Sequence, residues 1–139
     1  MKYATELSAC FDIEAAENTE IYPGDYKPIS TGVYVKDILP PDMALRCSTI
    51  DGDIVRCIEI CTRSGLAAKE GICALNAPGI VDADYPGEIM VILANFGKGV
   101  KYINKGDRIA QARIMEVIRI TSRISAGGKR EGGLGSTGK

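Results

Sequence analysis

The chain has 139 residues, of which 45% are hydrophobic and 25% charged, a composition typical of one globular domain with a real core. Its formal net charge of −1 excludes the strongly basic balance of many nucleic-acid-binding proteins, and no apolar run approaches the roughly 20 residues that span a bilayer. The N-terminal residues show no signal-peptide core, so we expect a cytoplasmic protein, or one of the host cytoplasm or nucleus if the chain is viral.

The side chains available for chemistry are limited, because the chain has five cysteines and no histidine. An odd cysteine count in a reducing compartment argues against a disulfide framework. Cys57 and Cys61 lie in a β-branched run that predicts a strand, where four residues span about 13 Å, too far for two ligands of one zinc ion. We interpret the cysteines as small buried hydrophobic residues. A catalytic base near neutral pH must then be a tuned carboxylate, lysine or tyrosine.

Short apolar runs that alternate with turn signals predict an all-β fold, such as a sandwich, a barrel or a jelly roll. Pro-Gly and Asp-Gly pairs mark turns, for example at Pro23-Gly24 and Asp51-Gly52. A weak helical signal covers residues 64–69. The predicted strands cover residues 11–15, 19–22, 27–35, 43–48, 53–61, 71–75, 88–95, 100–103 and 108–120.

The first polar residue within an apolar segment is Asp12, in the sequence ACFDI. A carboxylate at such a position is costly to bury unless it is ion-paired or works beside the water shell of a metal ion. The residues alone leave both the structural role and the metal-shell role open.

A second polar segment, TRSGLA at residues 62–67, follows the predicted strand 53–61. Arginine offers a fork of donors for phosphate oxygens, and the hydroxyl of Ser64 and the free N–H of Gly65 add donors beside it. Arg63, Ser64 and Gly65 therefore suit the binding of a triphosphate. The alternative is a strand end at which Ser64 caps a short helix.

The segment NAPGIVDADYPGE, residues 76–88, places two carboxylates and an aromatic between two Pro-Gly pairs. Apolar runs flank it on both sides, so we predict a hairpin whose tip carries chemistry rather than packing. Asp82 and Asp84 are candidate bases in a chain without histidine. They lie two residues apart, so both would face the same way in an extended strand, and the spacing does not choose between them.

The segment KGDRIAQ, residues 105–111, predicts a turn that enters the last strand. Arg108 can simply form an ion pair at this position. Gln111 is the unusual residue, because an amide among apolar neighbours requires a hydrogen-bond partner.

The last thirteen residues, GGKREGGLGSTGK, hold six of the sixteen glycines. Such a segment buries little and loses much entropy on ordering, so we expect it to be mobile without ligand. Its backbone N–H groups, hydroxyls and basic side chains are the parts of a phosphate clamp, whereas the alternative is a frayed terminus. We do not expect a Walker-type P-loop, because no Ser/Thr and helix follow Lys139.

Together these five segments resemble the five ordered motifs of the trimeric deoxyuridine triphosphatases (dUTPases), and the resemblance spans residues 9–138. It implies a jelly-roll-like, distorted β-barrel subunit of the β-clip kind. Residues 1–125 would form this domain, and residues 126–139 a mobile Gly-rich lid that carries the last motif. It also implies a homotrimer with shared active sites, Mg²⁺, and hydrolysis of dUTP to dUMP and pyrophosphate.

The resemblance also implies roles for individual residues. Asp82 would be the general base that activates water, and Gln111 would bind the α-phosphate or that water. Tyr85 would pack on the sugar, and the hairpin backbone with Asn76 would contact uracil. Asp12 would lie near the water shell of Mg²⁺, which is otherwise held by the substrate phosphates. The implied substrate contacts are Arg63, Ser64, Gly65, Asn76, Gly79, Val81, Tyr85, Lys129, Arg130, Leu134, Gly135, Ser136 and Thr137.

Several positions depart from the family pattern. At the position of a usual arginine before the tail glycines this chain has Lys129, with Arg130 one place closer to the glycines, and we favour Arg130 for the role because a guanidinium fork binds phosphate better. Leu134 replaces an aromatic that stacks on uracil, Pro86 an arginine, and Cys10 a glycine. Residues 48–61 include a stretch that is additional to the family pattern.

Two other functions remain open at this point. One is a dUTPase-like regulatory or interaction module that a nucleotide gates. The other is a relative of the deoxycytidine triphosphate deaminases, which RSGLA and the DADY hairpin match less well.

Overall fold

The computed structural model describes residues 1–40, 47–49 and 52–120. Most of the predicted strand 43–48 lies outside the described residues, as does the proposed lid, residues 126–139, with Lys129, Arg130, Leu134, Gly135, Ser136 and Thr137.

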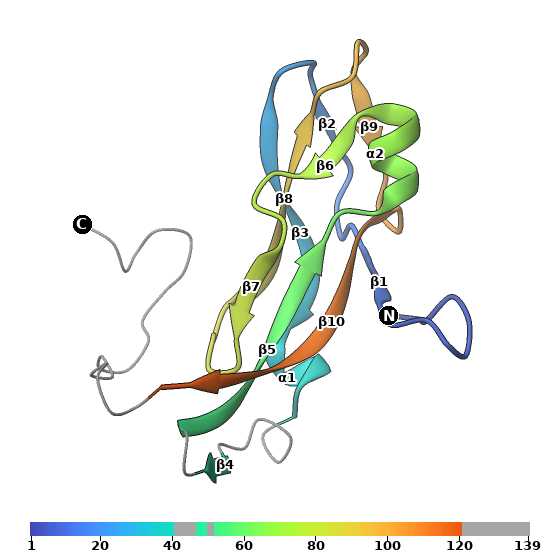
Figure 1. Ribbon diagram of the computed structural model, residues 1–139. Helices are drawn as coiled ribbons and strands as arrows, with labels where there is room; N and C mark the ends of the chain where they lie inside the picture. Colours follow the sequence, from blue (N-terminus) through green and yellow to red (C-terminus); the bar gives the residue numbers. More distant parts are fainter. Residues whose placement is uncertain (41–46, 50–51, 121–139) are drawn as a thin grey trace, which may run out of the picture.

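The described chain is built from strands with two short helices, which confirms the all-β prediction (Figure 1). The helix predicted at residues 64–69 is present as α2 (Ser64–Glu70). The strands are β1 (Phe11–Glu14), β2 (Thr19–Ile21), β3 (Tyr26–Tyr34), β4 (Cys47–Thr49), β5 (Gly52–Cys61), β6 (Ile72–Ala74), β7 (Gly79–Asp82), β8 (Glu88–Asn95), β9 (Lys101–Ile103) and β10 (Arg108–Arg119).

Two elements were not predicted. Helix α1 (Val35–Ile38) begins where the sequence predicts the end of a strand, and the Asp37 carboxylate accepts a hydrogen bond from the Tyr34 N–H at 2.8 Å. Strand β7 lies inside the predicted hairpin, where its four residues stand between a Pro-Gly pair and a turn. No helix among the described residues has the length and apolar character needed to cross a membrane.

The strands form two main sheets and a small third one. The first sheet has the order β1-β10-β5-β4, with β7 also paired to β5, and the second has the order β3-β8-β6. Strands β2 and β9 form a two-stranded sheet at the end of the molecule near α2 (Figure 1).

The core fills the space between the two main sheets. Ile89, Val91 and Leu93 of β8 are buried in alternation, as expected when one face of a sheet is covered, and Ile58 and Ile60 of β5 face them from the first sheet. Ile58 of β5 and Leu93 of β8 have no exposed surface. The other fully buried large residues are mostly isoleucines, at Ile13, Ile21, Ile29, Ile72, Ile89, Ile103 and Ile109.

The segment between β6 and β8 connects the two main sheets. β6 pairs with β8 in the second sheet, but β7, which lies between them in sequence, pairs antiparallel with β5 of the first sheet. The register places Gly79 opposite Ile60 and Asp82 opposite Cys57. The predicted hairpin is therefore a long excursion that leaves one sheet, adds a strand to the other and returns.

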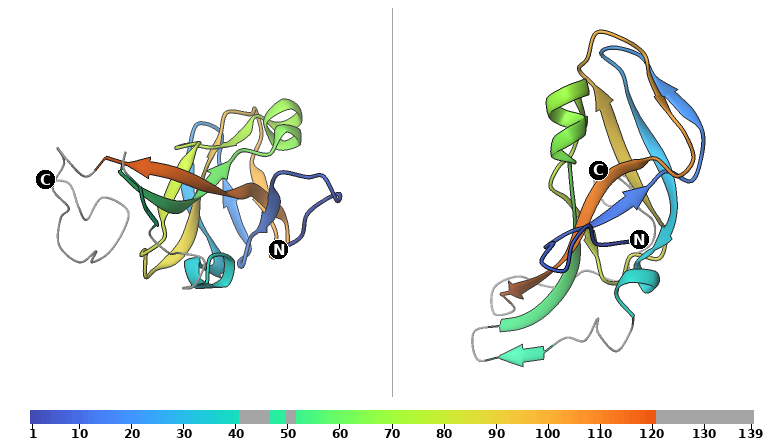
Figure 2. Two further views of the ribbon diagram at one scale, coloured as in Figure 1. Left: turned by 60° about the horizontal axis from the view of Figure 1, so that its bottom comes forward. Right: turned by 90° about the vertical axis from the view of Figure 1, so that its right-hand side faces the viewer.

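Strands β5 and β10 pair from Cys61 opposite Gln111 to Asp53 opposite Arg119, and their paired ends project beyond the body of the molecule (Figure 2). Gly52 begins the projecting part of β5 with φ of +146°, and a Cβ there would lie 2.5 Å from the Arg119 carbonyl oxygen. Glycine is thus required by both conformation and space. The extra stretch predicted at residues 48–61 contributes this projecting part.

Of the four cysteines whose side chains are described, Cys57 is buried, and Cys10, Cys61 and Cys73 are half-buried free thiols. The buried-hydrophobe interpretation thus fits Cys57 best. Burial raises the pKa of the Cys57 thiol, and the Glu59 carboxylate raises it further, so the group stays protonated near neutral pH.

A single carboxylate joins the start of β8 to β3. Glu88 Oε1 accepts hydrogen bonds from Ser30 Oγ at 2.5 Å, the Thr31 N–H at 2.9 Å and the Gly32 N–H at 2.6 Å. These donors, the Ser30 hydroxyl first among them, hold the pKa of Glu88 below its ordinary value. The contact fixes the point at which the chain re-enters the second sheet after the excursion.

Replacement of Leu93 by alanine should leave a cavity in the middle of the core. We expect Leu93→Ala to lower the free energy of unfolding by about 2–5 kcal/mol. Leu7→Ala is the matched control, because 94% of Leu7 is exposed and its truncation should leave stability almost unchanged. Urea denaturation followed by circular dichroism measures both, and equal stability of the two variants would contradict the assigned core.

The Glu88 contact should make stability depend on pH in a defined direction. Because the folded-state pKa is lowered, ionised Glu88 stabilises the fold fully above its ordinary pKa of about 4.5, and this contribution is lost as pH falls through the folded-state value. We expect Glu88→Gln to be less stable than the parent at pH 7, and the difference to shrink below pH 4.5. Thermal unfolding across this range tests it, and a difference independent of pH would contradict the charge-based explanation.

Candidate active site

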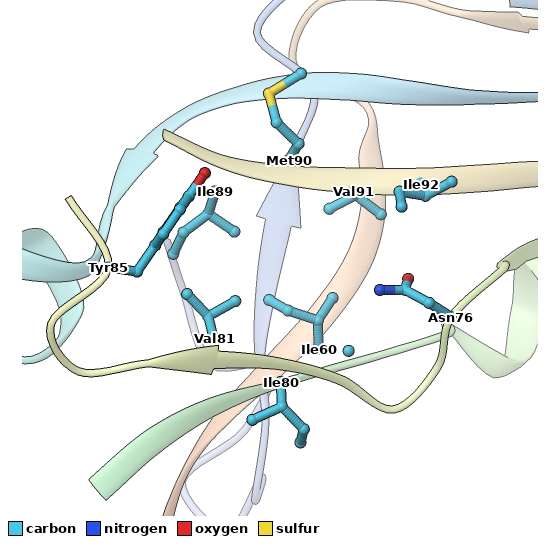
Figure 3. Close-up of a pocket in the computed structure, with 10 residues that line it drawn as sticks. Ile60, Asn76, Ile80, Val81, Tyr85, Ile89, Met90, Val91 and Ile92 are labelled. Atoms are coloured by element: carbon cyan, nitrogen blue, oxygen red, sulfur yellow. The ribbon is translucent and has the colours of Figure 1, made fainter. Parts of the chain in front are cut away.

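A pocket of about 110 Å³ lies between β7 and β8, where the excursion passes from one sheet to the other (Figure 3). Figure 3 shows Tyr85 near one end of this pocket and Asn76 near the other, with Val81 and Ile60 between them. The remaining lining residues are Gly79, Ile80, Ile89, Met90, Val91 and Ile92.

The two walls of the pocket differ in chemistry. One wall is apolar, because Ile60, Val81 and Ile89 belong to the core or pack against it. The other wall is the backbone of β7, which pairs with β5 on one edge and, among the described strands, with none on the other. An unpaired strand edge presents N–H and C=O groups in alternation. Together with the Asn76 amide, this edge gives a flat ligand both donors and acceptors.

Two glycines of the excursion leave room for the polar and aromatic side chains. A Cβ on Gly79 would lie 3.3 Å from Asn76 Nδ2, so a larger residue would crowd the amide. A Cβ on Gly87 would lie 2.6 Å from Tyr85 Oη, because the tyrosine ring lies back over this glycine. Neither glycine has a positive φ, so space rather than conformation is the constraint.

The two carboxylates of the excursion do not share a strand face. β7 ends at Asp82, and the Tyr85 N–H donates to the Asp82 carbonyl oxygen at 3.1 Å, which closes a turn that contains Asp84. Both aspartates are exposed. Because side chains alternate along a strand, Asp82 lies on the opposite face of β7 from Val81. Asp82 and Asp84 would face the same way in an extended strand, but here Asp82 ends the strand and Asp84 lies in the turn.

A second polar group lies at the other edge of the first sheet. Asp12 of β1 accepts from Arg63 Nε at 3.0 Å and from Arg108 Nη1 at 3.1 Å. Gln111 lies directly opposite Asp12 in the pairing of β1 with β10. We call Asp12, Arg63, Arg108 and Gln111 the arginine cluster. The ion-pair alternatives for Asp12 and Arg108 are confirmed.

Ser64 and Gly65 follow Arg63 at the start of α2 and are exposed. The helix cap is Arg63, which makes no side-chain capping bond, so the alternative in which Ser64 caps the helix is wrong. Gln111 Nε2 donates to the Thr62 carbonyl oxygen at 3.4 Å, a long contact that partly provides the partner its amide requires.

The pocket and the arginine cluster lie apart within one chain. One row of paired residues crosses β7, β5, β10 and β1, at Gly79, Ile60, Ala112 and Phe11. Three strand spacings, roughly 14 Å, therefore separate β7, which carries Gly79, from β1, which carries Asp12. Phe11 faces the core, so Asp12 faces the outside of the sheet. The pocket lies at the other edge, where Ile60 and Val81, which belong to the core or pack against it, line it.

Of the residues predicted for the site, Asn76, Gly79, Val81 and Tyr85 thus lie together at the pocket. Sequence reasoning missed the contribution of β8, whose apolar residues predict only a buried strand. It also missed Glu88 as an anchor of the excursion and Arg108 as the second partner of Asp12. Gly106-Asp107, beside Arg108, indicated only a turn and gave no sign that Arg108 pairs with Asp12.

The arginine cluster suits a magnesium ion poorly, because it holds one carboxylate, Asp12, which already pairs with two guanidinium groups. Within the described ranges, no group of three or more Cys, Asp and Glu side chains is arranged to hold a metal ion.

Comparisons with known proteins identify the family of this chain. The family model described as dUTPase matches residues 1–138. The chain is 43% identical over 142 residues to the deoxyuridine 5'-triphosphate nucleotidohydrolase of Anaplasma marginale (strain St. Maries), covering 98% of this chain and 86% of that protein. It is 41% identical over 143 residues to the same-named protein of Rickettsia felis, covering 99% and 86%.

Solved structures agree with the fold. The crystal structure of dUTPase from Streptococcus mutans matches with a TM-score of 0.68 and 24% identity, over 87% of this chain and 88% of that one. A D95N mutant dUTPase of phage phi11 of S. aureus, described with a structural Mg(II) ion, matches with a TM-score of 0.64 and 21% identity, over 91% and 87%. The family model and the curated relatives span nearly the whole chain, and this chain belongs to the dUTPase family.

Proposed function

We propose that this protein hydrolyses dUTP to dUMP and pyrophosphate, and that the pocket between β7 and β8 holds uracil and deoxyribose. One observation carries the proposal. The pocket combines polar groups, the free edge of β7 and the Asn76 amide, with an apolar wall and the ring of Tyr85. Membership of the dUTPase family supports the same reaction. We place the protein in the cytoplasm.

The pocket walls explain the choice of base. Uracil presents an acceptor, a donor and an acceptor along one edge, and the β7 backbone with Asn76 can complement this order. Cytosine changes two of the three positions and would leave buried polar groups unpaired. A site built on such hydrogen bonds can discriminate by about 10⁴.

Asp82 is the base in the proposed reaction. Its carboxylate takes a proton from a water molecule, the water oxygen bonds to the α-phosphorus, and the bond from the α-phosphorus to the bridging oxygen breaks to release pyrophosphate. Gln111 binds the α-phosphate or the attacking water, and Arg63, Ser64 and Gly65 bind phosphate oxygens. Mg²⁺ enters as part of the substrate, bound to the triphosphate.

The separation of the pocket from the arginine cluster supports a homotrimer with shared active sites. The pocket and the arginine cluster lie at opposite edges of the first sheet, three strand spacings or roughly 14 Å apart, which favours a site completed by another subunit. In the proposed trimer the pocket of one subunit faces the arginine cluster of another. The tail of a third subunit, with Lys129 or Arg130, Leu134, Gly135, Ser136 and Thr137, closes over the nucleotide and excludes water.

The direct test is pyrophosphate release from dUTP, dCTP, dTTP and UTP, each with Mg²⁺. Selective release from dUTP supports the proposal. Release from none of the four, with dUTP still bound, would favour a nucleotide-gated binding module instead.

Replacement of the proposed base should separate binding from chemistry. We expect Asp82→Asn to bind dUTP with nearly unchanged affinity and to lose about 10²–10⁴-fold in kcat, because the amide cannot accept the proton from water. Asp84→Asn is the matched control, since Asp84 is exposed in the adjoining turn. Steady-state kinetics and equilibrium binding test both variants, and a fully active Asp82→Asn would remove this residue from the mechanism.

An added methyl group at Gly87 should move the Tyr85 ring. Because a Cβ there would lie 2.6 Å from Tyr85 Oη, we expect Gly87→Ala to displace the ring and to reduce the preference for dUTP over UTP. Gly99→Ala is the matched control, because a Cβ at Gly99 has no atom within 4 Å. The ratio of kcat/KM for the two nucleotides measures the effect, and an unchanged ratio in Gly87→Ala would contradict the role given to Tyr85.

A further inference from the structure

We propose that Asp12 is a positioning residue, which together with Arg108 holds the guanidinium of Arg63 in one orientation for phosphate binding. Asp12 then acts through Arg63 and not through the water shell of a metal ion. The proposal rests on the proposed dUTP hydrolysis and specifies how the arginine cluster takes part in it.

The contacts within the cluster fix Arg63 at two points. Its Nε donates to Asp12 Oδ1 at 3.0 Å, and its Nη1 donates to the Arg108 carbonyl oxygen at 3.0 Å. A planar group held by two hydrogen bonds to separate strands cannot rotate freely. β1 supplies one acceptor and β10 the other, so the pairing of these strands sets the plane of the guanidinium.

Asp12 is itself a rigid anchor. Its chain neighbours Phe11 and Ile13 are 6% and 0% exposed, so the core fixes the backbone on both sides of it. Its side chain is 16% exposed, against 54% for Arg108. The Arg108 Nη1 contact at 3.1 Å occupies the second oxygen, Oδ2, and thereby orients the carboxylate toward Arg63.

The same geometry leaves part of Arg63 for a ligand. A guanidinium has five N–H donors, and the contacts of the described residues use Nε and Nη1. The Nη2 edge makes no contact in this part of the chain, and the side chain is 25% exposed. Two arginines and one aspartate give the cluster a net charge of +1, which suits a phosphate.

A role for Asp12 beside a metal ion fits this arrangement poorly. A cation or its waters would have to share a carboxylate whose two oxygens already accept from arginines, and would lie beside two positive charges. The two roles predict different results when the charge of Asp12 is removed. Loss of charge alone would strengthen phosphate binding, whereas loss of the anchor would weaken it.

The test uses Asp12→Asn and Arg108→Gln in the full-length protein, with binding of the non-hydrolysable α,β-imido analogue of dUTP measured by calorimetry. We expect each variant to bind about ten-fold more weakly, because Arg63 loses a charge-assisted contact or the partner that orients it. The loss should be the same with Mg²⁺ and with EDTA. Glu116→Gln is the matched control, since it removes a carboxylate paired with Arg56 at 2.7 Å elsewhere on β10.

The double variant Asp12→Asn/Arg108→Gln adds a further readout. Because both changes release the same guanidinium, the double variant should bind no worse than the weaker single variant. Tighter or unchanged binding in Asp12→Asn would overturn the proposal, as would a loss seen only with Mg²⁺. Arg108 is largely exposed, so its variant should fold even if Asp12→Asn does not, and unchanged binding in Arg108→Gln would also overturn the proposal.

Failure of the inference can be told from failure of the proposed function. A parent protein that neither binds the analogue nor releases pyrophosphate from dUTP lacks the function itself. If the parent is active and Asp12→Asn binds the analogue as tightly as Glu116→Gln does, the proposed function stands and the inference is overturned.

Discussion

The antiparallel pairing of β7 with β5 is the constraint on which the rest of the site depends. It pulls the chain out of the β3-β8-β6 sheet and holds one edge of a strand open toward β8. Without this pairing there would be no polar backbone wall opposite an apolar one. Glu88 returns the chain to the second sheet at a fixed position, so the pocket is bounded at both ends of the excursion.

Charge is organised differently in the two halves of the site. The pocket relies on neutral groups, the Asn76 amide and peptide edges, which suit an uncharged base. The arginine cluster places one carboxylate between two guanidinium groups, which suits a phosphate chain. In the proposed site this division matches dUTP, whose base is neutral and whose triphosphate carries several negative charges.

Much of the fold could be predicted because its local signals agree with one another. Strands 88–95 and 53–61 have long apolar runs bounded by turns, and the structure has β8 and β5 at nearly those bounds. The crossing of β7 could not be predicted, because four residues give no sign of which distant strand they pair with. The partners of Asp12 were equally hidden, since Arg63 and Arg108 lie 51 and 96 residues away in sequence.

The placement of the pocket and the arginine cluster at opposite edges of one sheet has a genetic consequence. In the proposed trimer, a chain with a defective pocket that assembles only with itself forms three inactive sites, and so does a chain with a defective arginine cluster. When both kinds of chain assemble in one cyclic trimer, one site always combines the intact pocket of one kind with the intact arginine cluster of the other. Two recessive lesions in this gene would therefore complement each other, with activity restored at one of the three sites of each mixed trimer.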